Sequence, residues 1–301
     1  MPIDYDRAGF PGNWPARSRQ SRRSLGAGGR ITGWLVAAAA LAVHPWMGAQ
    51  QQTSNPRAGW PCGARLDSSY FRVAEGSGGH LLLLAPAEIG DSAALLTAFG
   101  AHPQTIFRLA SEMKPGTHEF RVPIDSSVES VLFSMSVQCL QTADVARPSG
   151  ALVGGADVTD LSNFRAERMV IVSRPEPGVW TIRAAGSGVA GVMVQGRSAL
   201  GIAQVEFAAV GSTAFTPVPV AGVENAVRIG LSGHATQVDA SLVNGAFRRI
   251  ALLTLTPGET ESSYVSRFTP GTEGFRVLVE GKDADGVPFQ RVHAPLFTPT
   301  R

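Results

Sequence analysis

The chain has 301 residues and a mass of 31.6 kDa, which is enough for one large domain or two domains of ordinary size. Charged residues make up 17% and hydrophobic residues 44%, so the composition excludes a disordered chain. Residues 1–49 hold six of the 26 basic and two of the 24 acidic residues, which leaves 20 basic and 22 acidic residues elsewhere. The pI of 8.8 therefore reflects a basic leader, and no binding to nucleic acid is expected.

Residues 1–49 are predicted to be a signal peptide. Arg17–Arg30 is basic and free of acids, Ile31–Val43 is apolar, and Gly48-Ala49 supplies small residues for cleavage. As a helix the apolar run would span about 20 Å of a hydrocarbon core of about 30 Å, so no permanent membrane span is expected after cleavage. We therefore expect a secreted or periplasmic protein of bacterial type. The general secretory route is favoured, because Ser21–Leu25 matches a twin-arginine signal only in part.

The next two segments lead into the folded body. Residues 50–65 are polar and contain proline and glycine, which predicts a flexible linker. Residues 66–104 are predicted to form a small α/β segment. Its elements are a helix over Leu66–Glu75 with a polar cap and glycines behind it, a strand over His80–Ala85, and a second helix over Ile89–Phe99.

From residue 105 onward, strand-sized runs alternate with glycine, proline, serine and aspartate, which is typical of antiparallel β structure. Residues 105–212 are predicted to be a first β-sandwich domain and residues 225–299 a second. Residues 213–224 are predicted to be a linker, because Pro217 and Pro219 cannot serve a central ladder. The predicted fold class is mainly β: two antiparallel sandwiches, like immunoglobulin or fibronectin type III domains, behind a small α/β segment.

Within the first domain, four runs are predicted to be separate strands. They are Gln104–Ala110, His118–Val122, Val179–Ala184 and Val189–Gln195. The glycine-rich stretch Gly186–Gly191 matches a dinucleotide-binding pattern, but that mechanism needs a helix after the glycines. Because strands flank the stretch on both sides, a hairpin turn is favoured.

Three acidic motifs could carry chemistry but have a structural interpretation that is favoured. Gly90-Asp91-Ser92 resembles a nucleophile block of certain esterases and fits a helix cap. Asp157 and Asp160 could be paired carboxylates and fit loop capping. Asp283-Ala284-Asp285-Gly286 is a fragment of a calcium loop and fits a hairpin turn. We therefore predict no enzyme, and no catalytic residue, metal ligand or cofactor site.

Cys62 and Cys139 both lie behind the predicted leader. An oxidising compartment would permit a disulfide between them. Cys139 also lies in a strand-like run, Val131–Leu140, where a buried free thiol would pack as a small hydrophobic group. The sequence leaves both states open.

Several short sequence segments, in this order, resemble the region that follows the von Willebrand factor A-type domain in hemicentin-like extracellular proteins. They are Val122–Val128, Arg147–Gly150, Pro175–Trp180, Gly274–Glu280 and Phe289–Val292, and upstream of them Tyr70–Leu83 is similar to the last helix and strand of an A-type domain. The rest of such a domain is absent. Its Asp-x-Ser-x-Ser metal motif is not matched by Asp67-Ser68-Ser69 or by Asp125-Ser126-Ser127, so metal-dependent adhesion is not implied.

Five residues in these segments are candidates for a structural role. Pro177 and Gly178 set a turn before a strand, and Trp180 is a large anchor for the core between two sheets. Phe289 and Arg291 lie in the last of these segments, Phe289–Val292. The resemblance implies a non-catalytic interaction or structural protein that presents loops and sheet edges to an unidentified protein or glycan of the cell envelope or exterior. The alternative is a secreted hydrolase or carbohydrate-active enzyme with a site dispersed over loops.

Overall fold

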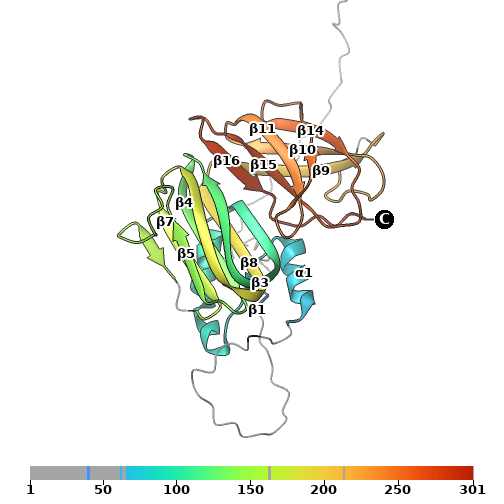
Figure 1. Ribbon diagram of the computed structural model, residues 1–301. Helices are drawn as coiled ribbons and strands as arrows, with labels where there is room; N and C mark the ends of the chain where they lie inside the picture. The colour runs from blue at the N-terminus through green and yellow to red at the C-terminus, as the bar shows by residue number, and fades with distance from the viewer. Residues whose placement is uncertain (1–38, 41–61, 63–65, 162–163, 213, 301) are drawn as a thin grey trace, which may run out of the picture. The chain divides into compact units, whose positions relative to one another are not determined.

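A computed structural model of the chain describes residues 39–40, 62, 66–161, 164–212 and 214–300. The fold is mainly β, as predicted (Figure 1). Its helices and strands, in chain order, are β1 (Ala39–Ala40), α1 (Ser68–Ser77), β2 (Leu81–Leu82), the 3-10 helix η1 (Pro86–Asp91), α2 (Ser92–Gly100), β3 (Gln104–Ile124), β4 (Val128–Val137), β5 (Thr142–Ala146), β6 (Val158–Asp160), β7 (Glu167–Ser173), β8 (Gly178–Ser198), β9 (Gly201–Ala209), β10 (Asn225–Ser232), β11 (Thr236–Val243), β12 (Arg249–Leu253), β13 (Thr256–Pro257), β14 (Ser263–Phe268), β15 (Arg276–Lys282) and β16 (Pro288–Val292).

The small α/β segment forms largely where the sequence predicts it. Asp67 caps α1, because its carboxylate accepts a hydrogen bond of 2.8 Å from the backbone N–H of Ser69. Gly78 ends the helix in the left-handed conformation, with φ +72°. The strand expected over His80–Ala85 is shorter, since only Leu81 and Leu82 pair, in parallel, with β1. Apart from β1, the predicted signal peptide lies outside the described residues, and the predicted linker does so apart from Cys62.

Residues 104–198, called module 1 below, contain two strands that belong to both layers of a sandwich. β3 and β8 pair antiparallel along their whole length, beginning with Gln104 opposite Gly196. The second half of β8 also pairs with β4, and its first half pairs with β5. The register of the pair shifts between Met113 and Gly116, opposite Gly188, whose φ is +88°. Both strands therefore run from one layer into the other at this bend.

The predicted hairpin turn at Gly186–Gly191 is consequently wrong, and each pair of predicted strands is one strand of 21 residues. The glycines of this stretch allow β8 to bend, and the chain does not reverse its direction there. At Gly188 the positive φ favours glycine, and at Gly186 a Cβ would lie 2.6 Å from the carbonyl oxygen of Cys139. The ladder continues on both sides of the bend because the opposing strand shifts its register at the same point.

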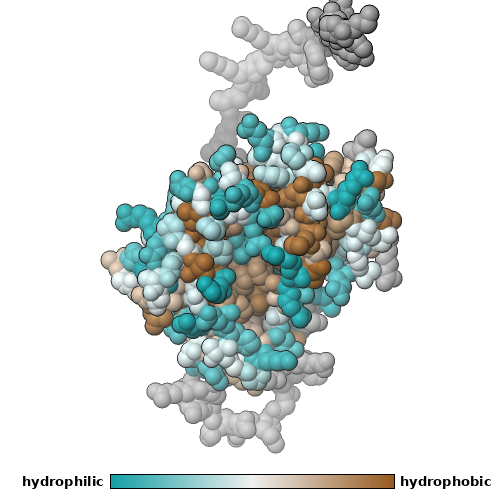
Figure 2. All heavy atoms as spheres, turned by 45° about the horizontal axis from the view of Figure 1, so that its top comes forward, coloured by the Kyte–Doolittle hydropathy of each residue, from teal (hydrophilic) through white to brown (hydrophobic). Residues whose placement is uncertain are grey.

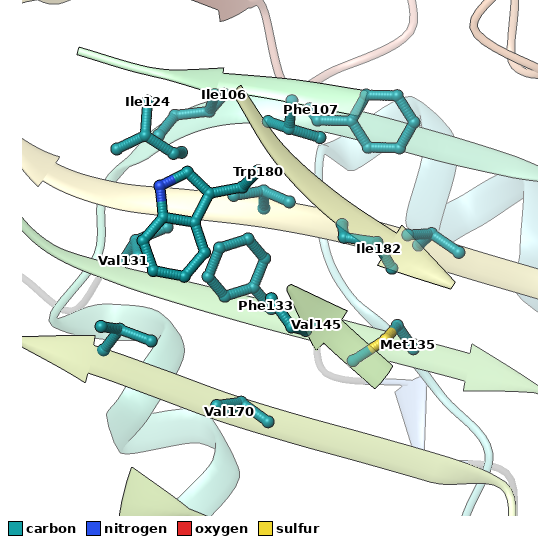
Figure 3. Close-up of a cluster of buried hydrophobic side chains, with 14 of the residues drawn as sticks. Ile106, Phe107, Ile124, Val131, Phe133, Met135, Val145, Val170, Trp180 and Ile182 are labelled. Carbon is teal, nitrogen blue, oxygen red and sulfur yellow. The ribbon is translucent and has the colours of Figure 1, made fainter. Parts of the chain in front are cut away.

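The core of module 1 lies between these layers. Trp180 and Ile182 come from one layer, and Val131, Phe133 and Val170 come from the other (Figure 3). All five side chains are fully buried. Burying each large apolar side chain contributes about 1.5–3 kcal/mol relative to leaving it in water, so this core accounts for much of the stability of the module.

The opposite face of the larger layer is also buried, because the α/β segment covers it. Leu132 and Met169 alternate with the core residues of β4 and β7 and contact Leu84, Leu95 and Phe99 of that segment. The strands of this layer therefore bury apolar side chains on both faces.

Residues 200–300, called module 2, form a second sandwich of two four-stranded sheets. The strand orders are β13-β14-β10-β9 and β12-β11-β15-β16, and a shared core includes Phe207, Phe275 and Phe289. β9 pairs with β10, whereas the sequence placed this strand in the first domain, which was predicted to end at residue 212. The turn Asp283–Gly286 joins β15 to β16 as a hairpin, as predicted. Within the described ranges, no helix has the length and apolar character needed to cross a membrane.

Candidate functional site: the junction of the modules

A buried ion pair joins the two modules. Asp125 follows β3 directly, Arg291 lies in β16, and neither side chain is exposed; the Nη1–Oδ2 distance is 2.7 Å. The guanidinium also donates to the carbonyl oxygen of Leu200 at 2.8 Å and to the hydroxyl of Ser198 at 2.9 Å. Ser127 donates to the other oxygen of Asp125 through its backbone N–H and its hydroxyl. Both charges are thus paired and hydrogen-bonded, as charges removed from water must be.

The neighbouring Ser126 connects the same loop to the hairpin turn of module 2. Its backbone N–H donates to Oδ2 of Asp283 at 2.9 Å, and its hydroxyl lies 2.6 Å from that oxygen and 2.7 Å from a carboxylate oxygen of Asp285. Burial alone would raise the pKa of Asp283, but hydrogen bonds from Ser126 and from backbone N–H groups of the turn hold it below its ordinary value. The calcium-loop fragment therefore contacts a loop of module 1. No group of three or more potential metal-binding side chains occurs among the described residues.

A second buried cluster links the α/β segment to both modules. Glu75 of α1 contacts Arg108 of β3 at 3.0 Å through one oxygen and Arg276 of β15 at 2.5 Å through the other. All three side chains are buried, with Arg276 fully inaccessible. Burial lowers the pKa of Arg276, while the Glu75 carboxylate opposes this shift and Arg108 adds to it. One carboxylate thus holds together three parts of the chain that are distant in sequence.

Arg108 has a further role at the end of α1. Its guanidinium donates to the carbonyl oxygens of Ala74 at 3.0 Å, Gly78 at 2.9 Å and Gly79 at 2.6 Å. The last carbonyls of a helix have no partner within the helix and carry partial negative charge, so a buried cation stabilises them. This contact fixes α1 on module 1.

Trp180 lies in the core of module 1 and is held from several sides. Its indole N–H donates to the carbonyl oxygen of Glu176 at 2.9 Å, and its ring packs on Phe133 with centroids 5.4 Å apart (Figure 3). The guanidinium of Arg147 lies 5.6 Å from the ring centroid. Trp180 therefore brings together two of the segments that resemble hemicentins, Arg147–Gly150 and Pro175–Trp180.

The remaining candidate residues have structural surroundings as well. Gly178 has φ +141°, and a Cβ there would lie 2.8 Å from Cγ of Pro148; Pro177 is exposed on the same turn. Phe289 is buried in the core of module 2. Arg291 lies at the junction, so the structure does not bring all five residues into one site.

Asp157 and Asp160 do not face each other as a catalytic pair would. Asp157 forms an ion pair with Arg147, and Asp160 forms one with Arg168, each at 2.9 Å. Gly90-Asp91-Ser92 lies where η1 passes into α2, as expected of a helix boundary.

Cys62 is exposed and Cys139 is half-buried, and both are free thiols in this structure. A side-chain hydrogen bond with Cys139 raises the pKa of Cys62, with burial and the charge of the neighbouring thiolate acting in the same direction. The two side chains are therefore neighbours although 77 positions separate them in the sequence.

The sequence did not point to one buried acid, Glu167 of β7. Its side chain is 1% exposed, and the hydroxyl of Ser134 donates to one of its oxygens at 2.7 Å. Burial raises the pKa of Glu167 to about 7, against hydrogen bonds from Ser136 and Ser134 that lower it. Ser136 also accepts a hydrogen bond of 3.0 Å from the backbone N–H of Leu83, so this polar cluster lies under the α/β segment.

Comparison with known proteins supports a hemicentin-like β-sandwich region. The family model described as the hemicentin galactose-binding domain-like domain matches residues 105–199, which coincide with β3 to β8. Hemicentin-1 of Mus musculus and of Homo sapiens are each 26% identical over 198 residues, or 62% of this chain, and Hemicentin-2 of Mus musculus is 24% identical over 79% of it. These matches span only 4–5% of the length of the hemicentins.

Two solved structures show distant likeness. The lipase BlEst2 of Bacillus licheniformis, in its propeptide form, aligns with a TM-score of 0.30 and 12% identity over 63% of this chain and 40% of the lipase. A β-glucuronidase of Bifidobacterium dentium aligns with a TM-score of 0.23 and 10% identity over 60% of this chain and 39% of the enzyme. Likeness at this level does not bear on function.

Proposed function

We propose that the chain is an exported, non-catalytic interaction or structural protein. In this proposal its β-sandwich loops and sheet edges contact a protein or glycan of the cell envelope or exterior, as the resemblance to hemicentins implies. The observation that carries the proposal is the ion pair between Asp125 and Arg291. These residues come from two of the segments that resemble hemicentins, and their ion pair fixes one module on the other.

The match of a family model to module 1 supports the same function. That model is described as galactose-binding domain-like, and its boundaries agree with β3 and β8, the strands that span both layers. A rigid sandwich of this kind holds its loops in fixed positions, which lowers the entropy lost when a partner binds.

Several large apolar side chains are exposed on the surface of both modules. On the face drawn in Figure 2, hydrophobic residues form several separate patches among hydrophilic ones. Large exposed apolar side chains include Leu152 and Val179 in module 1 and Leu252 in module 2. Large apolar patches rimmed by polar groups mark surfaces that bind other proteins, whereas single exposed apolar residues occur on most soluble proteins.

The proposal extends to the α/β segment and to the route of export. α1 followed by β2 has the order expected at the end of an A-type domain, which supports the resemblance of Tyr70–Leu83 to that domain. The basic and apolar leader supports export by the general secretory route to the periplasm or the exterior.

The test begins with expression of the full chain in an exporting bacterial host and N-terminal sequencing of the product. The exported protein is then immobilised and incubated with cell-envelope extract, and a heat-unfolded sample serves as the control. We expect a start near Gln50 and retention of a specific protein or glycan on the folded sample alone. Turnover of an ester or glycan library without any retained partner would overturn the proposal in favour of a hydrolase.

A further inference from the structure

One strand of the fold comes from the predicted signal peptide. β1 lies in the apolar run of the leader and pairs in parallel with β2, with Ala39 opposite Leu81 and Ala40 opposite Leu82. The two strands form a sheet of their own, and β1 is the strand partner of β2 among the described residues. Cleavage of the leader near Ala49 would therefore remove the partner of β2 that the structure describes.

β2 itself is held in place by the rest of the fold. Leu82 is 6% exposed and packs with Leu84 in the core beneath the α/β segment. The next residue, Leu83, is fully buried, and its backbone N–H donates to the hydroxyl of Ser136 at 3.0 Å. Cleavage would therefore leave a fixed strand whose edge can pair with another extended segment.

An apolar hollow lies beside this strand, between α1, β2 and the bend of β3 and β8. Its volume is about 200 Å³, and its apolar lining consists of Leu66, Phe71, Leu81 and Val189. Sites for small molecules usually enclose roughly 300–1,000 Å³, so this hollow fits a large side chain better than a whole ligand. The edge of β2 and the hollow therefore suit a strand that carries one such side chain.

The register of β1 indicates which residue of a paired strand would lie beside the hollow. Residues opposite each other in neighbouring strands belong to the same face of the sheet. Position 39 thus lies on the face of β2 that carries Leu81, and Leu81 lines the hollow. The leader has alanine at this position. A large aliphatic residue there would bury more apolar surface.

We propose that β2 and the hollow are a binding site for an extended apolar segment of a partner protein. The segment runs parallel to β2 and places a large aliphatic side chain opposite Leu81. In the unprocessed chain Ala39–Ala40 occupies the edge, and cleavage of the leader frees it, so the opening of the site rests on the proposed export. Main-chain hydrogen bonds supply affinity in this mode of binding, and the hollow supplies specificity.

The leader should compete with such a partner as a tethered ligand. The paired segment is short, so a free peptide with the leader sequence should bind the processed chain with a Kd on the order of 100 µM. A short tether gives an effective concentration of about 1 mM. The tethered strand should therefore weaken the binding of a free peptide to the unprocessed chain about tenfold.

Cross-linking tests the pairing in the unprocessed full chain, which cell-free translation without membranes supplies. Neighbouring strands lie about 4.8 Å apart, within the roughly 4.4–6.8 Å between Cα atoms that a disulfide spans. With both native cysteines changed to serine, Ala39→Cys/Leu81→Cys should form an intramolecular disulfide on oxidation with copper phenanthroline. Ala39→Cys/Leu252→Cys is the matched control, because Leu252 belongs to β12 of module 2. Equal cross-linking of both pairs, or none of the first, would overturn the pairing.

Fluorescence anisotropy of a labelled peptide with the sequence of residues 31–49 tests the site. The processed chain should bind it about tenfold more tightly than the unprocessed chain. Ala39→Leu in the peptide should lower the Kd at least about tenfold, whereas Ala40→Leu, which is opposite Leu82 on the other face, should not. Phe71→Ser in the protein should remove this gain, and Tyr70→Ser, one position away and outside the lining, should keep it.

The outcomes separate this site from the proposed export. No binding to the processed chain at up to about 1 mM, or equal gains from both leucine peptides, would overturn the site even if the leader is cleaved. N-terminal sequencing that finds the leader intact on the exported product would overturn the proposed processing and the opening of the site, while the cross-link still decides whether β1 pairs with β2.

Discussion

Asp125 and Arg291 are 166 positions apart in the sequence, and each is inaccessible to solvent in contact with the other. Removing one partner leaves the other charge buried without compensation, which costs about 3–5 kcal/mol. We expect Asp125→Ala to lower the free energy of unfolding by about that amount in a denaturant titration. Glu129→Gln is the matched control, because its partner Arg197 and Glu129 itself are both 68% exposed, and it should change the free energy by less than about 0.5 kcal/mol.

The double variant Asp125→Leu/Arg291→Met distinguishes a lost pair from a lost fold. With both charges removed, no ion is left buried alone, so the double variant should be more stable than Asp125→Ala. Equal losses in the single and double variants would show that the charges do not act as a pair.

Gly178 and Gly116 allow backbone strain to be separated from crowding. Their φ angles are +141° and +140°, but a Cβ at Gly178 would lie 2.8 Å from Pro148, whereas one at Gly116 meets nothing within 4 Å. Alanine should cost about 1–3 kcal/mol at either position through the backbone. Gly178→Ala should cost about 1 kcal/mol more than Gly116→Ala, measured by denaturant unfolding, because the turn must move away from Pro148. Equal costs would mean that the contact with Pro148 does not restrict the turn.

The buried carboxyl of Glu167 predicts a pH dependence of stability. Its pKa is about 7 in the folded chain and 4.5 is the ordinary value, so the folded state binds more protons between these values. The stability of the wild type relative to Glu167→Gln should therefore fall as the pH rises from 4.5 to 7, by about 3 kcal/mol, and then level off. Denaturant titrations of both proteins across this range measure the difference.

Comparing the two proteins at each pH is necessary because His80 acts in the opposite direction. Burial, assisted by the charge of Arg108, lowers its pKa from 6.5 to about 3, so its contribution is lost as the pH falls below 6.5. His80 is present in both proteins, and its effect cancels in the difference. A difference that does not vary with pH would show that Glu167 titrates normally in the folded chain.

The adjacent thiols of Cys62 and Cys139 predict a disulfide in protein recovered from an oxidising compartment. Its mass before reduction should be lower than after reduction by two hydrogens, and a peptide that joins the two cysteines should appear in a digest. Closing this loop should add about 4 kcal/mol to the free energy of unfolding, and reduction or Cys62→Ser should remove it. Alkylation of both thiols without prior reduction would contradict the prediction.

Local patterns in the sequence predicted the mainly β fold, the caps of α1 and the hairpin at Asp283–Gly286. They failed at Gly186–Gly191, because glycine serves a tight turn and a strand bend equally well, and only the partner strand decides between them. The boundary of the first domain was also placed too late. Nothing within β9 shows which of two sheets it joins, since that depends on pairing with β10.

The junction was visible only in part. The resemblance singled out Arg291, but its partner Asp125 lies in another segment, Val122–Val128, and no local sequence pattern connects the two residues. Arg108 and Arg276 each interrupt an apolar strand, which is a signal that a buried charge requires a partner. Glu167 gave no such signal, because it stands among charged residues at the start of its strand.

The first residue of β3 pairs near the end of β8, with Gln104 opposite Gly196, so the chain enters and leaves module 1 at the same place. A pulling force carried from the α/β segment to module 2 would then open this strand pair from its end, one ladder bond at a time, instead of shearing it along its length. The contact of Glu75 with Arg276 bypasses module 1 altogether. While the contact between Glu75 and Arg276 is intact, a force between the α/β segment and module 2 is therefore carried by that contact and not by the pair of β3 and β8.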